Sequence, residues 1–301
     1  LDSLDTSGVD TSTLKVTGDE ALVITDALDV DITTVTATDF TGGLTAVGAN
    51  TATGMTMTGG SGADVFTSST GNDNLTGGEG NDELSPSTGT DTVTGGKGND
   101  TAKFAAAALT LVDTVSGGEG TDSIQYTGDE TVVDADFTLV TSVETITADA
   151  NINITATLDK LAAAAGVTNV VLTDTEAADS VTINEDFTND LTVTLSDDGT
   201  ATSSNVDSVI ANSEYSKVLS VIALSSDMDA ENPVITGGKG TSDKLTIQLD
   251  ATDSPILSDV SNIETIELTD GDTTANHTGT LTLADANATY TSATNYQTLT
   301  I

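Results

Sequence analysis

Glycine-rich turns that end in an aspartate recur at a fixed spacing in this chain. Four full copies, GGSGADVFT, GGEGNDELS, GGKGNDTAK and GGEGTDSIQ, begin at Gly59, Gly77, Gly95 and Gly117. The aspartate at the sixth position is a hard oxygen ligand of the kind that calcium prefers. Glycine at the first, second and fourth positions allows positive φ or close backbone packing. The pattern therefore predicts a series of calcium-binding turns.

Weaker nine-residue units fill the gaps between the full copies. SSTGNDNLT begins at Ser68 and PSTGTDTVT at Pro86, so the frame is unbroken over residues 59–103. Residues 104–107 interrupt the frame, and ALTLVDTVS resumes it at Ala108. Motifs one coil apart share a side of a solenoid. We therefore expect the full copies along one edge and the degenerate copies along the other, with the insertion on the degenerate side.

The eighth position of each unit is apolar and alternates with polar neighbours, as in a short strand with one inward side chain. These residues are Phe66, Leu75, Leu84, Val93, Val115 and Ile124. Each unit then supplies a turn and a three-residue strand, and two units make a coil that stacks in parallel on the next. Glycine-rich turns lose much entropy on ordering, so calcium between the turns must supply free energy. Ala102 and the alanine-rich insertion predict a distorted coil.

In these repeats the chain resembles the RTX (repeats-in-toxin) family, whose calcium-binding nonapeptide reads G-G-x-G-x-D-x-U-x with U apolar. The resemblance covers residues 59–125 and one isolated copy at Gly237. It implies side-chain ligands at Asp64, Asp73, Asp82, Asp91, Asp100 and Asp122, with Asp113 as the candidate in the degenerate copy that has lost every glycine. It implies backbone carbonyl ligands in the turns that contain Gly59, Gly62, Gly77, Gly80, Gly95, Gly98, Gly117 and Gly120.

We expect calcium between the full copies 59 and 77, 77 and 95, and 95 and 117, and between the degenerate copies 68 and 86. The gap between copies 86 and 108 stays open, because the later copy lacks glycine. Two roles for the metal also stay open. Calcium either holds the coils together or acts as a switch at the ambient calcium level, in the millimolar range that extracellular modules use.

A longer repeat is visible further along the chain. The turn at Gly117 and the phrase SVETI at Ser142 recur 120 residues later as GGKGTSDKL at Gly237 and NIETI at Asn262. One extra residue precedes Asp243 in the second copy. Asp243 is therefore either a calcium ligand or a solvated carboxylate beside a glycine turn.

The predicted fold is all-β, a parallel β-roll or β-solenoid flanked by further β-rich modules of solenoid-like or sandwich type. The predicted segments are leading coils at 1–58, the β-roll at 59–125, a β-rich module at 126–234 with a short helix near 158–165, and a second β-rich module at 235–301. Alternating apolar residues predict strands at 21–25, 32–37, 55–58, 181–183, 191–195, 245–249, 266–268 and 281–283.

Composition excludes several functions. With 48 acidic and 7 basic side chains the net charge is −41, which excludes nucleic-acid binding and a polybasic membrane contact. No apolar run is long enough for membrane insertion, and the absence of cysteine rules out disulfides. Catalytic motifs are absent and His277 is the only histidine, so we expect no enzyme. About five calcium ions would offset only about ten charges. The remaining charge either lies on a solvated acidic surface or binds further calcium outside the nonapeptides, and we expect the latter.

The acidic, threonine-rich, cysteine-free composition and the phrases FTGGL and SVETI resemble RTX-type surface-layer (S-layer) proteins of Gram-negative bacteria. That resemblance implies type I secretion and a calcium-dependent lattice of the chain with itself on the cell surface, with cell-surface polysaccharide bound through another region. Two alternatives stay open: a stalk module of an RTX adhesin or motility protein, and the calcium-binding tail of a secreted enzyme or toxin. Because the chain starts at Leu1, we expect a mature segment or a fragment.

Overall fold

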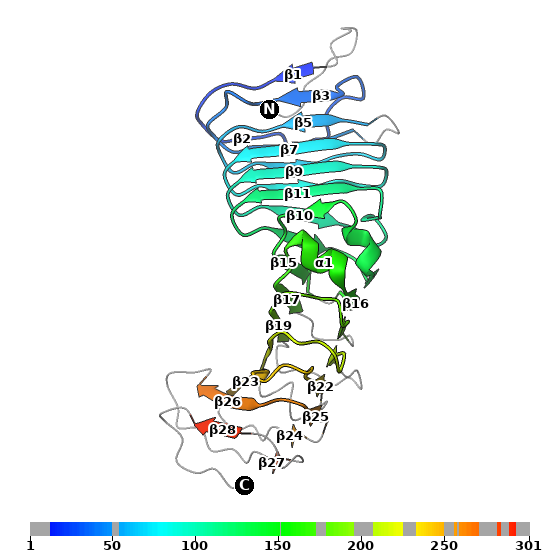
Figure 1. Ribbon diagram of the computed structural model, residues 1–301. Helices are drawn as coiled ribbons and strands as arrows, with labels where there is room; N and C mark the ends of the chain where they lie inside the picture. Colours follow the sequence, from blue (N-terminus) through cyan, green and yellow to red (C-terminus); the bar gives the residue numbers. More distant parts are fainter. Residues whose placement is uncertain are drawn as a thin grey trace. The chain divides into compact units, whose positions relative to one another are not determined.

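The chain forms an all-β parallel solenoid with almost no helix (Figure 1). The computed structural model describes residues 13–49, 54–150, 152–172, 179–195, 207–224, 233–249, 256–257, 259–270, 282–283 and 289–292. The chain divides into two compact units, residues 1–128 with 135–146 and residues 129–134 with 147–301. In the described part, no helix is long and apolar enough to cross a membrane.

The first unit contains two parallel sheets whose strands alternate along the chain, and Figure 1 shows β5, β7, β9 and β11 stacked as successive rungs. The first sheet contains β1 (Thr13–Lys15), β3 (Thr34–Thr36), β5 (Thr56–Thr58), β7 (Asn74–Glu79), β9 (Thr92–Lys97), β11 (Thr114–Glu119) and β14 (Val140–Thr141). The second contains β2 (Leu22–Val23), β4 (Leu44–Val47), β6 (Val65–Thr67), β8 (Glu83–Ser85), β10 (Thr101–Phe104) and β12 (Ser123–Tyr126). A 3-10 turn covers Asp134–Phe137, and β15 covers Thr145–Ala148.

Alternation of side chains along each short strand builds the core of the first unit. The apolar eighth-position residues of the repeats all point inward, and each exposes 2% or less of its surface: Phe66, Leu75, Leu84, Val93, Val115 and Ile124. The parallel register places like on like, because Leu75 pairs with Val93 and Val93 with Val115. The predicted inward column is therefore confirmed, and it stabilises the stack by removing a branched or aromatic side chain from water in every half-coil.

The strands on one side of the unit are longer than the predicted three residues. β7, β9 and β11 each continue through the two glycines that open the next copy, so that Gly78 pairs with Gly96 and Gly96 with Gly118. Gly96 has a φ of 125°, and a Cβ there would lie 2.0 Å from the Gly78 carbonyl oxygen. Only glycine fits such a close backbone contact. The glycines that open each turn can therefore also pair as the last residues of a strand.

The insertion after residue 103 does not distort the coil, so that prediction was wrong. β10 keeps its register with β12 from Thr101, paired with Ser123, through Phe104, paired with Tyr126. The extra residues leave the ladder after Phe104, where Ala107 adopts a φ of 56° and the three alanines before Ala108 are exposed. The small side chains allow this excursion at a corner while the strands on either side stay stacked.

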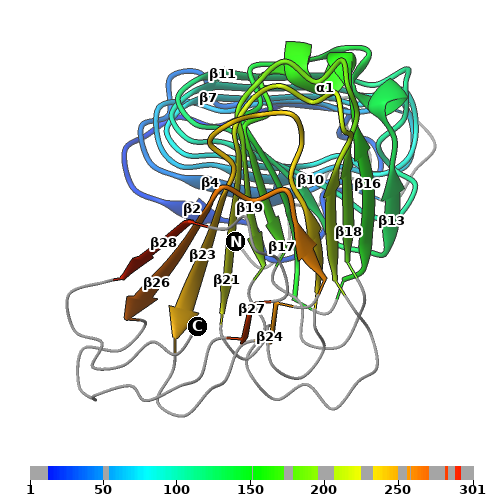
Figure 2. The same ribbon diagram turned by 60° about the horizontal axis from the view of Figure 1, so that its bottom comes forward.

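The second unit also consists of parallel coils. One sheet contains β13 (Glu130–Val132), β16 (Ile154–Leu158), β18 (Ser180–Ile183), β20 (Ser208–Ala211), β22 (Val234–Thr236) and β25 (Val260–Ser261), of which Figure 2 shows the first three side by side. The other sheet contains β17 (Asn169–Leu172), β19 (Leu191–Leu195), β21 (Leu219–Leu224), β23 (Lys244–Leu249), β26 (Thr265–Asp270) and β28 (Thr289–Ser292). β24 (Ile256–Leu257) pairs with β27 (Thr282–Leu283). Equivalent residues are now 21 to 28 positions apart rather than 18.

Apolar columns hold the second unit together in the same way. A register-aligned column runs through successive coils and is buried throughout: Val170, Val193, Val221, Leu245 and Ile266. The strands predicted at 181–183, 191–195, 245–249 and 266–268 are confirmed, and those predicted at 21–25, 32–37 and 55–58 contain β2, β3 and β5. β27 covers part of the strand predicted at 281–283, and Leu281 lies outside the described residues.

The predicted helix near 158–165 is present and starts slightly later, as α1 (Lys160–Ala165). Leu158 ends β16 instead, and Asp159 is the N-cap residue, whose carboxylate accepts the N–H of Lys160. Gly166 ends the helix in the left-handed conformation with a φ of 113°, as glycine at this position commonly does.

Candidate calcium sites

The aspartates of the full copies stack along one edge of the first unit. The Oδ1 atoms of Asp82, Asp100 and Asp122 accept the backbone N–H of the aspartate one coil earlier, at 2.7, 2.8 and 2.8 Å. Asp64 begins the series by accepting the N–H of Leu44 at 2.7 Å. These four side chains expose 4% or less of their surface. The backbone of the neighbouring coil therefore fixes each carboxylate in a dry position.

The aspartates of the degenerate copies form a second, separate series. Asp91 Oδ1 accepts the N–H of Asp73 at 2.8 Å, and Asp113 Oδ1 accepts the N–H of Asp91 at 2.7 Å. The step from 91 to 113 is 22 residues, which is the same as the step from 100 to 122. The predicted separation into two edges is confirmed, and the insertion shifts both edges by the same amount.

The second carboxylate oxygen distinguishes the sites from one another. The Oδ2 atoms of Asp82, Asp91, Asp100 and Asp122 are buried and have no hydrogen-bond partner. A buried carboxylate oxygen without a partner is strongly unfavourable, because it has lost water and gained nothing in return. A bound cation would supply the missing partner.

The glycine at the first position of each turn leaves the space that such a cation needs. A Cβ on Gly59 would lie 2.0 Å from Asp64 Oδ2 and 2.1 Å from the Gly77 carbonyl oxygen. A Cβ on Gly95 would lie 2.3 Å from Asp100 Oδ2 and 2.4 Å from the carbonyl oxygen at 117. A carboxylate oxygen of one turn and a carbonyl oxygen of the next therefore face the same space. This donor set fits calcium, which binds oxygen and accepts backbone carbonyls.

A calcium ion at these positions would need backbone oxygens as ligands. Among the residues that the structure describes, no three side chains of His, Cys, Asp or Glu converge in a way that could hold a metal. The fourth-position glycines, Gly62, Gly80, Gly98 and Gly120, stack so that each carbonyl oxygen lies against the next glycine. A calcium ion bound here would be held by one or two carboxylates and by carbonyl oxygens of two coils.

Burial and neighbouring charge disfavour ionisation of these carboxyl groups in the metal-free chain. Burial raises the pKa of Asp82 to about 7, and the charges of Asp100 and Asp64 add to the rise. Burial likewise raises the pKa of Asp91 and of Asp122 to about 6. The pKa values of Asp64, Asp73, Asp100 and Asp243 are also raised by burial. Electrostatic strain of this kind is relieved by a divalent cation or by protons.

Three of the predicted aspartates have a protein partner for the second oxygen. Asp113 Oδ2 accepts hydrogen bonds from the backbone N–H and the hydroxyl of Thr110, at 2.7 and 2.8 Å. Asp73 Oδ2 accepts from the Ser68 hydroxyl at 2.7 Å, and Asp64 Oδ2 from the Gly60 N–H at 2.9 Å. At Asp113 the turn that lacks glycine has closed onto the carboxylate, and two donors satisfy the second oxygen without metal. Asp73 Oδ2 and Asp64 Oδ2 each have one donor and keep further acceptor capacity for an ion.

This difference predicts opposite results for two substitutions on the same edge. Asp91→Asn is expected to remove one bound calcium ion per chain, since the unpartnered oxygen is replaced by an amide. Asp113→Asn is expected to leave the number of bound ions unchanged, although it weakens the local turn by about 1–2 kcal/mol through the Thr110 contacts. Native mass spectrometry in calcium measures both. Equal losses in the two variants would contradict the assignment.

Asp243 in the second unit resembles the first aspartate of the repeat block. Its side chain is fully buried, which excludes the solvated carboxylate. Oδ1 accepts the N–H of Leu219 at 2.9 Å and Oδ2 the N–H of Gly238 at 2.8 Å, as Asp64 does with Leu44 and Gly60.

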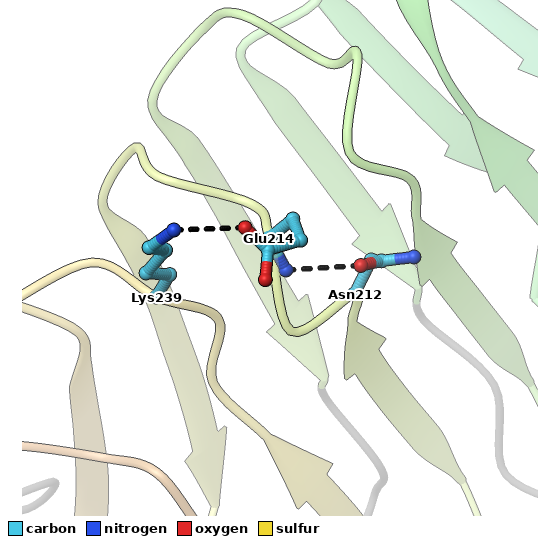
Figure 3. Close-up of polar contacts among 3 residues, drawn as sticks. All are labelled: Asn212, Glu214 and Lys239. Carbon is cyan, nitrogen blue, oxygen red and sulfur yellow. Dashed lines mark hydrogen bonds and ion pairs between the residues drawn. The ribbon is translucent and has the colours of Figure 1, made fainter.

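The isolated glycine turn at 237–240 also stacks on an earlier coil, although no copy precedes it by 18 residues. Lys239 pairs with Glu214, 2.8 Å away and 25 residues earlier, and Asn212 Oδ1 accepts the N–H of Glu214 at 2.9 Å (Figure 3). Both Lys239 and Glu214 are exposed, so this pair contributes little energy. It marks the register in which the turn lies on its neighbour.

Sequence reasoning missed two glutamates, and it missed the hydrogen bond between Asp179 and Asp207. Glu144 Oε2 accepts the N–H of Asp122, and Glu264 Oε2 accepts the N–H of Asp243, both at 2.8 Å. The repeated phrases SVETI and NIETI were the available signal. Asp207 Oδ1 accepts the N–H of Asp179 at 2.9 Å, and no repeat in the sequence marks that pair.

The stacked coils, the glycine turns and the buried aspartate edges together define a calcium-binding β-roll. Residues 58–93 and 85–102 match the RTX calcium-binding nonapeptide repeat in four copies. The chain therefore carries RTX repeats, which bind calcium and are typical of secreted, extracellular proteins. No curated protein and no solved structure matches the chain. His277 lies outside the described residues.

Proposed function

We propose that this chain is a structural component of a calcium-dependent surface layer outside a bacterial cell, and that it has no catalytic role. The observation that supports the proposal most directly is that the coils continue beyond the RTX block. The second unit repeats the parallel coils and apolar columns without the nonapeptide spacing. A chain that consists largely of stacked coils is suited to a structural role.

The charge of the chain also favours calcium at contacts between copies. The net charge of −41 makes identical molecules repel one another at close range. Divalent cations shared between acidic surfaces would overcome this repulsion. We therefore propose that calcium serves twice, between the coils and between the subunits of the lattice, and that cell-surface polysaccharide binds through another region.

Electron microscopy of the purified chain tests this proposal. With millimolar calcium the protein is expected to form ordered two-dimensional sheets, and a chelator is expected to dissolve them. Magnesium at the same concentration is the control, because its stricter geometry suits these carbonyl-rich sites poorly. A monodisperse monomer in calcium would refute the lattice and favour a stalk of an adhesin. A catalytic domain adjoining this segment would favour the tail of an enzyme or toxin.

A further inference from the structure

The last aspartate of the full copies has no site among the gaps predicted from the nonapeptides. The three gaps between copies 59, 77, 95 and 117 are assigned to Asp64, Asp82 and Asp100, and beside Gly59 and Gly95 the Oδ2 atom faces a carbonyl oxygen of the following coil. Asp122 remains, with 1% of its surface exposed and its Oδ2 unpartnered. A small cavity lined in part by Gly117, Asp122 and Val143 lies beside it.

The coil that follows Asp122 provides the missing half of a site. A Cβ on Gly117 would lie 1.9 Å from the Ser142 carbonyl oxygen and 2.4 Å from Asp122 Oδ2. These two oxygens thus face one space, as the carboxylate and carbonyl oxygens do beside Gly59 and Gly95. Ser142 adopts a φ of 53°, an uncommon left-handed conformation for a residue other than glycine. The turn at Ser142 thus occupies the position that a glycine-rich turn has in the nonapeptide coils.

Glu144 takes the place that an aspartate has in the nonapeptides. Its Oε2 atom accepts the N–H of Asp122 at 2.8 Å, the contact that Asp122 itself makes with Asp100. The N–H groups of Glu144 and Thr145 both donate to the Asp122 carbonyl oxygen at 3.0 Å. The backbone of Asp122 is therefore held from both sides by a coil that is not a nonapeptide.

The same arrangement occurs again in the second unit. Asn262 has a φ of 53°, and its carbonyl oxygen would lie 1.9 Å from a Cβ on Gly237, with Asp243 Oδ2 at 2.7 Å. Glu264 Oε2 accepts the N–H of Asp243 at 2.8 Å, and the N–H groups of Glu264 and Thr265 donate to the Asp243 carbonyl oxygen at 3.1 Å. Two coils with the pattern [SN]-[VI]-E-T-I thus have the same geometry.

We propose that each coil with this pattern closes a calcium site with the glycine turn before it. In the first unit the ligands are Asp122 Oδ2 and the Ser142 carbonyl oxygen. In the second they are the Asn262 carbonyl oxygen and Asp243 Oδ2, which accepts one N–H, from Gly238, and keeps further acceptor capacity for the ion. Glu144 and Glu264 are positioning residues, which fix the aspartate through its N–H and add negative charge beside the ion. The second site requires no nonapeptide neighbour.

Asp243→Asn in the full chain is the decisive test, because no nonapeptide site lies beside it that could lose an ion instead. Native mass spectrometry with calcium as the only added metal is expected to show one bound ion fewer than the wild type. Glu214→Gln, in the exposed pair with Lys239 on the same turn, is the matched control and is expected to keep the full number. An unchanged number in Asp243→Asn would overturn the proposal.

Glu264→Gln gives a second measurement in case the first variant folds poorly. The amide oxygen can still accept the Asp243 N–H, so the fold is retained while the charge beside the ion is lost. Calcium affinity at one site is expected to fall about tenfold, since ligand charge tunes such sites over several orders of magnitude. Isothermal titration calorimetry measures this, and an affinity equal to that of the wild type would refute the role of the glutamate. Neither measurement requires a lattice.

Discussion

Removal of calcium is expected to unfold the coils of the RTX block while the second unit keeps most of its strands. Asp64, Asp82 and Asp100 stand in one buried row, so without a cation their charges repel one another in a dry environment. A ligand at 100 times its dissociation constant adds about 2.7 kcal/mol per site. Several ions together therefore equal the whole stability of an ordinary domain, about 5–15 kcal/mol.

Hydrogen exchange read by mass spectrometry resolves this effect along the chain. In a chelator, peptides from residues 59–125 are expected to exchange quickly, and peptides that contain β19 and β21 are expected to stay protected by their apolar columns. Circular dichroism should show a matching partial loss of strand signal that calcium restores. If residues 59–125 remain protected without calcium, the metal is not the source of their stability.

Acid is expected to replace calcium in part. In the metal-free fold the pKa of Asp82 is raised to about 7 and the pKa values of Asp91 and Asp122 to about 6, against 3.8 for the unperturbed group. The folded chain then binds more protons than the unfolded chain between about pH 4 and about pH 7. Its stability is therefore highest at the acid end of this window and is lost as the pH rises. Each pH unit is worth about 1.4 kcal/mol for one fully shifted group.

Thermal melts across this window, with and without calcium, measure the effect. Without calcium the melting temperature should fall as the pH rises, and with calcium it should rise, because protons compete with the metal for the same oxygens. High salt is included to screen the repulsion between surface charges. Salt screens interactions between buried charges much less. In the metal-free chain at alkaline pH, Asp82→Asn should be more stable than the wild type, and with calcium it should be less stable. A wild type whose metal-free stability rises with pH would contradict this account.

The repeat block could be predicted closely because its spacing is strict. A fixed nine-residue period places Phe66 over Leu84 and Asp64 beside Asp82 by arithmetic alone. The second unit follows the same physics with coils of variable length, so its partners cannot be found by counting. The apolar column through Val193 and Val221 becomes visible only when the register is known.

The details of the sites were predictable to a lesser degree. That Thr110 satisfies Asp113 depends on how one turn folds back, which no spacing records. Glu144 and Glu264 stood in a phrase already recognised as repeated, yet their role emerges only from the N–H groups that they accept. The extra strand residues at Gly78 and Gly96 required the backbone contact between neighbouring coils to be seen.

The carboxylates of Asp64, Asp100 and Asp122 each engage two neighbours, one oxygen accepting an N–H from the coil before and the other facing a carbonyl oxygen of the coil after. Occupation of one gap therefore orders the halves of the two adjacent gaps. Such a row behaves as a one-dimensional chain of nearest-neighbour couplings. Calcium uptake should be cooperative, with a titration steeper than that of independent sites. Loss should start at a terminal calcium gap, which has a neighbouring gap on one side only.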